Sequence, residues 1–450
     1  MTRPRSSDPS KSQHLCVLVH GLWGNATHLN YVADSLRDRY PDDQLIVYSA
    51  KRNTGSLTYD GIEIGAERVA KEVEDLLEEL ARDGHRVDKF SIVGYSLGGL
   101  VSRFVIGLLD HKAYFDRITP VNFVTFATPH LGVRTPLLGY QNHLWNVLGA
   151  RTLSTSGRQL FMIDNFRQTG RPLLSVLADP ESIFIHALAK FQKRCLYANI
   201  VNDRSSVFYT TGISKYDPYV HMDRLRLHYV KNYDPVILDP EHPFEKLPQQ
   251  QLATFYDRIR TTGQTFLRRI PILLAIGILV PIATIGFLIN SAIQTFRSRR
   301  RIQLHEKDEQ GLSAMYRIPF FVQNMRVGLE DAFENVNSAQ EQEYLPEGSE
   351  ELADVPSSPS ISRQTTADSI SAEKANSAAA DRVHDFPTLA LTPAQFAIIK
   401  SLDDVGFKKF PVYIHKTTHS HAAMIVRVPR PSFDEGKLVV KHWLENEFRL

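Results

Sequence analysis

A serine flanked by glycines, at a point where a buried strand gives way to a helix, constrains the fold of this chain most strongly. The motif is Gly94-Tyr95-Ser96-Leu97-Gly98-Gly99. The apolar run Phe90–Val93 before it has the length of a strand, and Leu97–Leu109 after it has apolar residues at helical spacing. Because flanking glycines let the backbone turn sharply, we expect Ser96 to be strained, with its hydroxyl exposed above a sheet.

Strand-like and helix-like runs alternate from His14 to about Val201. This alternation is typical of an α/β fold, with a mostly parallel sheet covered by helices on both faces. Helices are predicted over Glu63–Ala81 and Pro393–Asp404, and a late strand over Phe410–Ile414. Further strands are predicted at residues 15–19, 44–48, 121–126 and 196–201.

The loop His20-Gly21-Leu22-Trp23-Gly24 directly follows the first predicted strand. A loop at this place can aim a backbone N–H at a developing oxyanion, together with the N–H of the residue after the serine. We therefore assign an oxyanion hole to the main-chain N–H groups of Leu22 and Leu97. The two histidines near this edge, His20 and His130, are interpreted as structural and loop-shaping residues.

An orienting acid and a base should follow the serine in the order Ser, Asp, His. Asp203 comes just beyond the strand that ends in Ile200-Val201, at the edge where ligand sites form. Asp217, Asp223 and Asp234 are alternatives that follow no clear core strand.

The base must lie in the ordered C-terminal part of the chain. We choose His421 because small and apolar residues that can pack on the sheet follow it. His419 is the alternative, His415 is a third histidine of the same segment, and His384 ends a polar stretch.

The charge-free run Ile270–Ile289 contains thirteen Ile, Leu, Val or Phe residues. Its length and polarity predict a membrane-associating segment. Pro281 lies within it, and basic residues flank both ends (Arg268, Arg269 and the run from Arg297 to Arg301). Since serine and base must reach one sheet, we prefer a hairpin that enters and leaves on one side over a full crossing.

Composition along the chain predicts six parts. These are a polar tail (1–13), a core with nucleophile and acid (14–260), the apolar segment (261–300), a possible interfacial segment (301–337), a disordered linker (338–385) and a C-terminal core part with the base (386–450). The tail lacks the apolar stretch of a secretory signal.

A net charge of +2 gives no electrostatic argument for nucleic acid as a partner. The two cysteines, Cys16 and Cys195, lie in apolar runs, which favours buried thiols and a reducing, cytosol-facing catalytic domain. No spacing of Cys, His and carboxylates predicts a metal site, and the proposed chemistry requires no cofactor.

The chain resembles the fungal putative serine esterase family that includes the lipid-droplet phospholipases. The resemblance covers about residues 14–230 and 391–445, and rests on HGLWG, VGYSLGGLVSR, FATPHLGV, YANIVNDRSSVFYT and HSHAAMIVR. It implies an α/β-hydrolase with a Ser96–Asp203–His421 triad, an insertion between acid and base, and acyl-lipid substrates. It also implies residence on lipid droplets or the endoplasmic reticulum membrane.

These observations together predict a lipase or phospholipase that works through an acyl-enzyme, bound to a lipid surface through Ile270–Ile289. Two alternatives remain open at this point. One is an acyl-protein thioesterase with the same triad, and the other is a membrane-bound scaffold that has lost the chemistry.

Overall fold

The structure, a computed structural model, describes residues 12–134, 136, 154–203, 206–247, 296–298, 300–304, 343–345 and 386–450. The predicted apolar segment Ile270–Ile289, His384, and most of the predicted segments 301–337 and 338–385 lie outside the described residues. Within the described residues, no helix is both long and apolar enough to cross a membrane.

A six-stranded sheet forms the centre of the molecule, with strand order β2-β1-β3-β4-β5-β8 and parallel pairing between all neighbours. The strands are Ser12–Val19 (β1), Leu45–Ser49 (β2), Arg86–Tyr95 (β3), Thr119–Phe126 (β4), Lys193–Asn199 (β5) and Lys408–Val412 (β8). Parallel strands buried on both faces read as continuous apolar runs, which is why the sequence revealed them.

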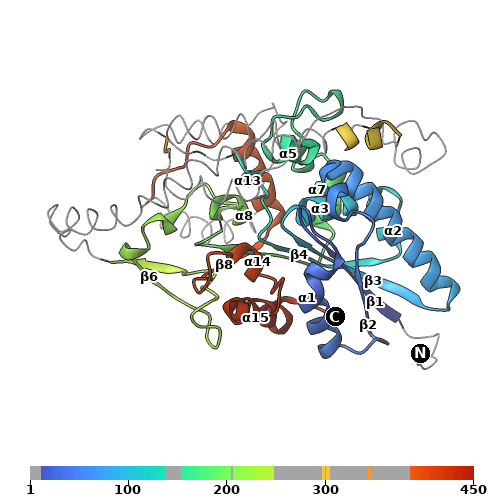
Figure 1. The fold of residues 1–450 in the computed structure, drawn as a ribbon, viewed down its shortest axis with the longest axis horizontal. Coiled ribbons are helices and arrows are strands. Elements are labelled where there is room, and N and C mark those ends of the chain that lie inside the picture. Colours follow the sequence, from blue (N-terminus) through green and yellow to red (C-terminus); the bar gives the residue numbers. More distant parts are fainter. Residues whose placement is uncertain are drawn as a thin grey trace, which may run out of the picture.

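Helices cover both faces of the sheet, as Figure 1 shows. One layer contains α2 (Ile62–Arg82), α3 (Leu97–His111), α7 (Ile183–Ala189) and α13 (Pro393–Val405), and the other contains α1 (Asn30–Arg39) and α15 (Asp434–His442). Alternate residues of β1 divide between the layers: Leu15 and Val17 pack in the first core, Cys16 and Leu18 in the second. This is the predicted α/β-hydrolase fold.

The predicted last strand is displaced by two residues. The structure ends β8 at Val412, whereas the apolar pattern continues to Ile414. After Val412 the chain leaves β5, and the N–H of Tyr413 donates instead to the carbonyl oxygen of Val236. Ile414 is buried in the second core without belonging to a strand, a difference that hydropathy cannot distinguish.

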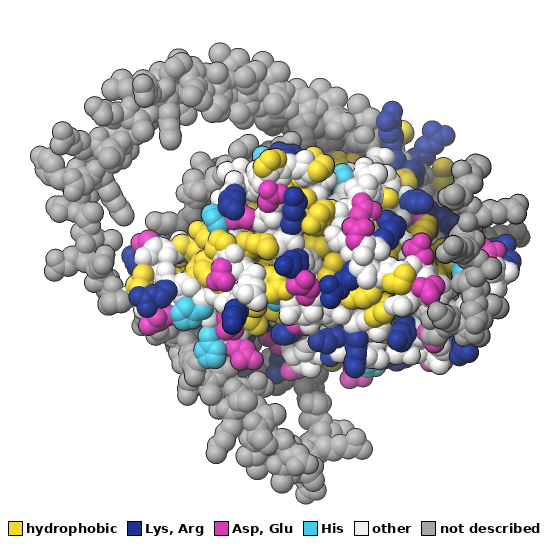
Figure 2. All heavy atoms as spheres, turned by 90° about the horizontal axis from the view of Figure 1, so that it is seen from below, with side chains coloured by type: hydrophobic (Ala, Val, Ile, Leu, Met, Phe, Trp, Pro, Cys, Tyr) yellow, Lys and Arg dark blue, Asp and Glu magenta, His cyan; other side chains and the backbone are white. Residues whose placement is uncertain are grey.

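Shorter elements complete the described part of the chain. Those near the site are the 3₁₀ helix η2 (Gly55–Tyr59), α5 (Ser154–Leu160), α8 (Phe208–Thr211) and α14 (Ser420–Ala423). An antiparallel pair, β6 (Leu225–Leu227) and β7 (Phe244–Lys246), was not predicted. On the face drawn in Figure 2, basic and acidic side chains are interspersed among hydrophobic patches, so charge there is mixed.

Candidate active site

Ser96 occupies the turn between β3 and α3 in a strained conformation. Its backbone has φ 55° and ψ −129°, a region that residues with a side chain rarely adopt. Two hydrogen bonds hold the turn: the Ser96 N–H donates to the carbonyl oxygen of Phe126 at 2.9 Å, and the Thr128 hydroxyl donates to the Ser96 carbonyl oxygen at 2.9 Å. The strain is therefore supported from β4, and the side chain projects at the carboxyl edge of the sheet.

Two glycines allow the loop after β1 to pack on this turn. A Cβ atom at Gly98 would collide with the carbonyl oxygens of Val19 and His20. A Cβ at Gly21 would lie 2.7 Å from the Cβ of Ser96 and 3.2 Å from its Oγ. The loop His20–Gly24 thus contacts the serine directly.

Asp203 follows β5 and is buried beside the same edge of the sheet. Its Oδ1 accepts the N–H of Ser206 at 2.8 Å, and its Oδ2 accepts the side-chain amide of Asn199 at 3.2 Å. These donors fix the plane of the carboxylate. Asn199 was not predicted as a site residue, although it is the last residue of β5, four residues before Asp203.

The ring of His421, in α14, lies between Ser96 and Asp203. Its Nδ1 is 2.8 Å from Asp203 Oδ2, and its Nε2 is 2.9 Å from Ser96 Oγ. A carboxylate accepts hydrogen bonds only, so Nδ1 carries the proton and donates to Asp203. Nε2 then accepts the hydrogen bond of the Ser96 hydroxyl.

Neighbouring groups orient α14 on the sheet. The Tyr95 hydroxyl donates to the main-chain carbonyl oxygen of His421 at 3.2 Å, and the two rings lie 5.1 Å apart. The Ser420 hydroxyl donates to the carbonyl oxygen of Val201 at 3.1 Å. Tyr95 is a positioning residue that the sequence analysis missed; its place beside Ser96 was the only available signal.

The N–H groups of Leu22 and Leu97 are the donors assigned to an oxyanion hole. Leu97 is the first residue of α3, and Leu22 follows the glycine that touches Ser96. Among the described residues, neither N–H donates to a protein acceptor. Both groups are therefore available to a bound oxygen beside the serine.

The other histidines discussed in the sequence analysis lie in different surroundings. His415 is 3.0 Å from the Glu435 carboxylate, and the side chain of His419 is exposed. His20 Nδ1 contacts the carbonyl oxygen of Gly21 at 3.1 Å, and burial lowers its pKa. His130 Nε2 is 3.0 Å from the Thr125 hydroxyl; burial, then the nearby charges of Arg103 and Lys409, holds its pKa well below 6.5.

The alternative acids occupy other places in the structure. Asp217 caps the 3₁₀ helix Pro218–Arg224 through the N–H of Tyr219 at 3.2 Å, and Asp223 is exposed. Asp234 precedes a cis proline. Within the described part of the chain, no group of three His, Cys, Asp or Glu side chains could hold a metal ion.

Residues 9–216 match the model of a family described as "Putative serine esterase". Over these residues the chain is similar to that family. The match includes Ser96 and Asp203 and ends before His421, so the histidine that the fold brings to the serine lies outside the matched residues.

Part of the chain is also similar to curated yeast proteins. "Putative lipase ROG1" of Saccharomyces cerevisiae is 33% identical over 212 residues, which is 46% of this chain and 29% of that protein. "Putative lipase C4A8.10" of Schizosaccharomyces pombe is 31% identical over 216 residues, which is 47% of this chain and 27% of that protein. The matched region thus spans less than a third of the length of these two relatives.

Two solved structures are similar to parts of this chain. Phospholipase PlaB from Legionella pneumophila has a TM-score of 0.28 at 13% identity, and the match covers 44% of this chain and 42% of that one. The peroxisomal α/β-hydrolase Lpx1 from Saccharomyces cerevisiae has a TM-score of 0.27 at 13% identity, covering 44% of this chain and 65% of that one.

Proposed function

We propose that this chain is a serine lipase or phospholipase, which hydrolyses acyl esters of glycerolipids and glycerophospholipids through an acyl-enzyme. One observation carries the proposal: the His421 ring lies 2.9 Å from Ser96 Oγ and 2.8 Å from Asp203 Oδ2. A strained serine, a histidine base and an orienting carboxylate form the arrangement that activates a hydroxyl for acyl transfer.

In the first half of the reaction, His421 Nε2 takes the proton of the Ser96 hydroxyl as Oγ bonds to the ester carbonyl carbon. The carbonyl oxygen becomes an oxyanion, which the N–H groups of Leu22 and Leu97 bind. Asp203 stabilises the imidazolium that forms. The C–O bond of the ester then breaks, and the leaving alcohol takes its proton from His421.

In the second half, a water molecule replaces the alcohol. His421 Nε2 takes one of its protons as the water oxygen bonds to the acyl carbon. The bond between the acyl carbon and Ser96 Oγ then breaks, His421 gives that proton to Ser96 Oγ, and the fatty acid is released. The histidine thus acts as base and then acid in each half, and no cofactor takes part.

Two observations support a lipid as the acyl donor. The relatives carry lipase names, and the chain contains the apolar run Ile270–Ile289, which lies outside the described residues. Such a run beside an ester hydrolase suits an insoluble substrate. The proposal includes residence on lipid droplets or the endoplasmic reticulum membrane, with the catalytic domain facing the cytosol.

A hairpin insertion is supported by the ends of the stretch that contains the apolar run. Strand β7 ends at Lys246, and residues 296–298 and 300–304 contact the core again through Asp60. Both flanks therefore belong to one folded domain. A segment that entered a bilayer between them has to return on the same side, as Ser96 and His421 also require.

The activity is tested by comparing wild type with Ser96→Ala on phospholipids, mono- and triacylglycerols and acyl-thioesters, following released fatty acid. Ser432→Ala, outside the site, is the matched control. We expect glycerol esters to be cleaved, with activity and fluorophosphonate labelling lost only in Ser96→Ala. A preference for acyl-thioesters would favour the thioesterase alternative. Equal release of fatty acid by all three proteins, or no release by any of them, would favour the catalytically inactive scaffold.

The membrane proposal is tested by flotation of the full chain with artificial lipid droplets. Replacing Ile276, Leu279 and Ile285 by aspartate places charges in the apolar run, each of which costs roughly 2.5 to 3.5 kcal/mol at a bilayer centre. We expect the wild type to float and the variant to remain in the dense fraction. Flotation of both proteins would contradict the assignment of this run as the anchor.

A further inference from the structure

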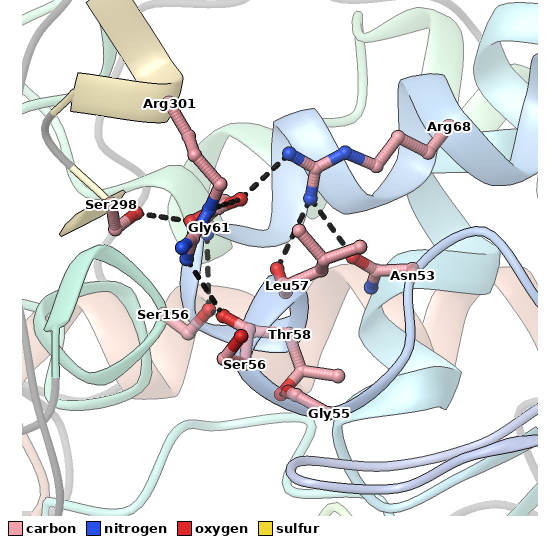
Figure 3. Close-up of polar contacts among 11 residues, drawn as sticks. Asn53, Gly55, Ser56, Leu57, Thr58, Gly61, Arg68, Ser156, Ser298 and Arg301 are labelled. Carbon is pink, nitrogen blue, oxygen red and sulfur yellow. Dashed lines mark hydrogen bonds and ion pairs between the residues drawn. The ribbon is translucent and has the colours of Figure 1, made fainter. Parts of the chain in front are cut away.

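Basic residues that follow the apolar run contact the catalytic core at one buried carboxylate. Residues 296–298 and 300–304 are helical, and Ser298 and Arg301 project from them toward the loop of η2 and Gly61, as Figure 3 shows. The Ser298 hydroxyl donates to Asp60 Oδ1. Arg301 binds the same carboxylate with two nitrogens, Nη2 to Oδ1 at 3.0 Å and Nε to Oδ2 at 3.2 Å.

Asp60 is fully buried and lies between two guanidinium groups. Its second partner, Arg68 of α2, donates to Oδ2 at 2.6 Å and also reaches the carbonyl oxygen of Leu57 at 3.2 Å. Arg301 donates in addition to the carbonyl oxygen of Ser56 at 3.0 Å. A planar guanidinium that binds a carboxylate through two parallel donors defines orientation as well as distance.

The loop that carries Asp60 also holds the loop beside the serine. Thr58 Oγ1 accepts the N–H of Trp23 at 3.0 Å, and the Gly55 N–H donates to the carbonyl oxygen of Gly24 at 2.8 Å. Trp23 and Gly24 belong to the loop in which Gly21 touches Ser96. Asp60 therefore joins residues 296–304 to the assigned oxyanion loop through a short, continuous set of contacts.

The outer side of the helical turn carries apolar groups. Phe296 is 70% exposed and Leu304 is 62% exposed, whereas Ile302 packs inward. Seven residues lead from Ile289, the end of the apolar run, to Phe296, and a chain of that length reaches at most about 25 Å. The contact therefore sets an upper limit of about 25 Å on the distance between Phe296 and the end of the apolar run.

We propose that Arg301 and Asp60 form a positioning pair, which fixes residues 296–298 and 300–304, the segment that follows the apolar run in the sequence, on the loop that holds the oxyanion loop, so that the ester site faces the lipid surface. The inference rests on the proposed function, because it assigns the lipid surface as the place from which the substrate comes. Asp60 and Arg301 act through the loops that they join and touch no reacting atom.

The test separates hydrolysis at a surface from hydrolysis in solution. Full-length wild type, Arg301→Ala, Arg301→Lys and the matched control Arg300→Ala are compared on vesicles of phosphatidylcholine alone and on dissolved p-nitrophenyl butyrate. Arg300 is exposed on the same turn, so its replacement removes the same charge without touching Asp60. Flotation with the same vesicles measures binding separately from turnover.

We expect Arg301→Ala to lose about tenfold or more on vesicles, because the site no longer keeps a fixed place at the surface. Its rate on the dissolved ester stays within about twofold of wild type, because Arg68 still holds Asp60 and the η2 loop. Flotation is unchanged, Arg301→Lys recovers part of the vesicle rate, and Arg300→Ala behaves as wild type.

Other outcomes overturn the positioning role. An equal loss of activity on vesicles and on the dissolved ester in Arg301→Ala would show that the pair only stabilises the fold. A loss of flotation that parallels the loss of vesicle hydrolysis would show that the pair contributes to membrane binding. A similar loss in Arg300→Ala would attribute the effect to charge, and an unchanged vesicle rate in Arg301→Ala would remove the pair from the reaction. Failure of the proposed function is distinguishable, because the wild type would then show no Ser96-dependent hydrolysis of the dissolved ester.

Discussion

The main chain of Gly21 lies in contact with the side chain of Ser96, and a Cβ at position 21 would approach the Ser96 Cβ to 2.7 Å. No side chain fits between the loop and the serine. The N–H of Leu22, one residue further on, therefore has its position set by how closely this glycine packs. Any group that displaces the loop also displaces that donor.

Gly21→Ala is expected to lower kcat by roughly 10² to 10³, because the loss of one oxyanion donor has about this effect in hydrolases of this kind. The extra methyl group pushes the loop away from Ser96. Steady-state kinetics on a dissolved ester measure the loss, and far-ultraviolet circular dichroism verifies the fold. A wild-type kcat in a folded variant would remove Leu22 from the proposed oxyanion hole.

Asp203→Asn is expected to reduce kcat by about 10⁴ while leaving the fold intact. An asparagine amide that faces His421 Nδ1 donates to it, so the ring proton moves to Nε2, and Nε2 can then no longer accept the Ser96 proton. Asp223→Asn, at an exposed position, is the matched control and is expected to keep wild-type kinetics. Equal rates for the two variants would reject Asp203 as the acid.

His421→Gln and His419→Gln test the choice of His421 over its alternative, His419. Only His421 touches Ser96, at 2.9 Å, and the side chain of His419 is exposed. We expect fluorophosphonate labelling and ester hydrolysis to disappear in His421→Gln and to persist in His419→Gln. Loss of activity in the second variant alone would assign the base to His419.

Protein stability is expected to fall as the pH is lowered from about 6.5 toward 4. Burial is the main cause that lowers the pKa of His14 and of His442 to about 4, from an ordinary value of 6.5. Between these values the unfolded chain binds protons that the folded chain does not. Each histidine therefore contributes up to about 1.4 kcal/mol per pH unit to the loss of unfolding free energy.

Urea unfolding at several pH values measures this dependence. His442→Asn retains an acceptor for the Tyr197 hydroxyl, which lies 2.8 Å from His442 Nδ1, and removes one titrating group. We expect the slope of unfolding free energy against pH to decrease in this variant. His111→Asn, at an exposed site, is expected to keep the wild-type slope, and an unchanged slope in His442→Asn would contradict the assignment.

Features of the fold that depend on residues close together in the sequence were predictable. The apolar runs of β1, β3, β4 and β5 and the periodicity of α2 and α3 are local patterns, and the glycines around Ser96 mark the turn between two of these elements. Asp203 was predictable because it directly follows a core strand. The serine and the acid were therefore predicted from their placement at strand ends, and the base from the small and apolar residues that follow it.

Contacts between distant segments were not predictable. Ser298 and Arg301 are 238 and 241 residues from Asp60, and no local pattern marks Asp60 as their partner. The choice between His419 and His421 also depends on how α14 packs on β5, through the contact of Ser420 with Val201. The antiparallel pair β6–β7 has strands of three residues, too short for an alternation pattern.

The pairing of β8 with β5 has a consequence for biosynthesis. Asp203 and His421 are 218 residues apart, so a nascent chain exposes its serine and its acid long before the ribosome has made the base. β5 lacks its partner strand β8 during that interval, so the sheet and the proposed triad are completed close together in time. A chain that begins to associate with lipid during synthesis would therefore have no activity toward it until the segment around His421 has been made.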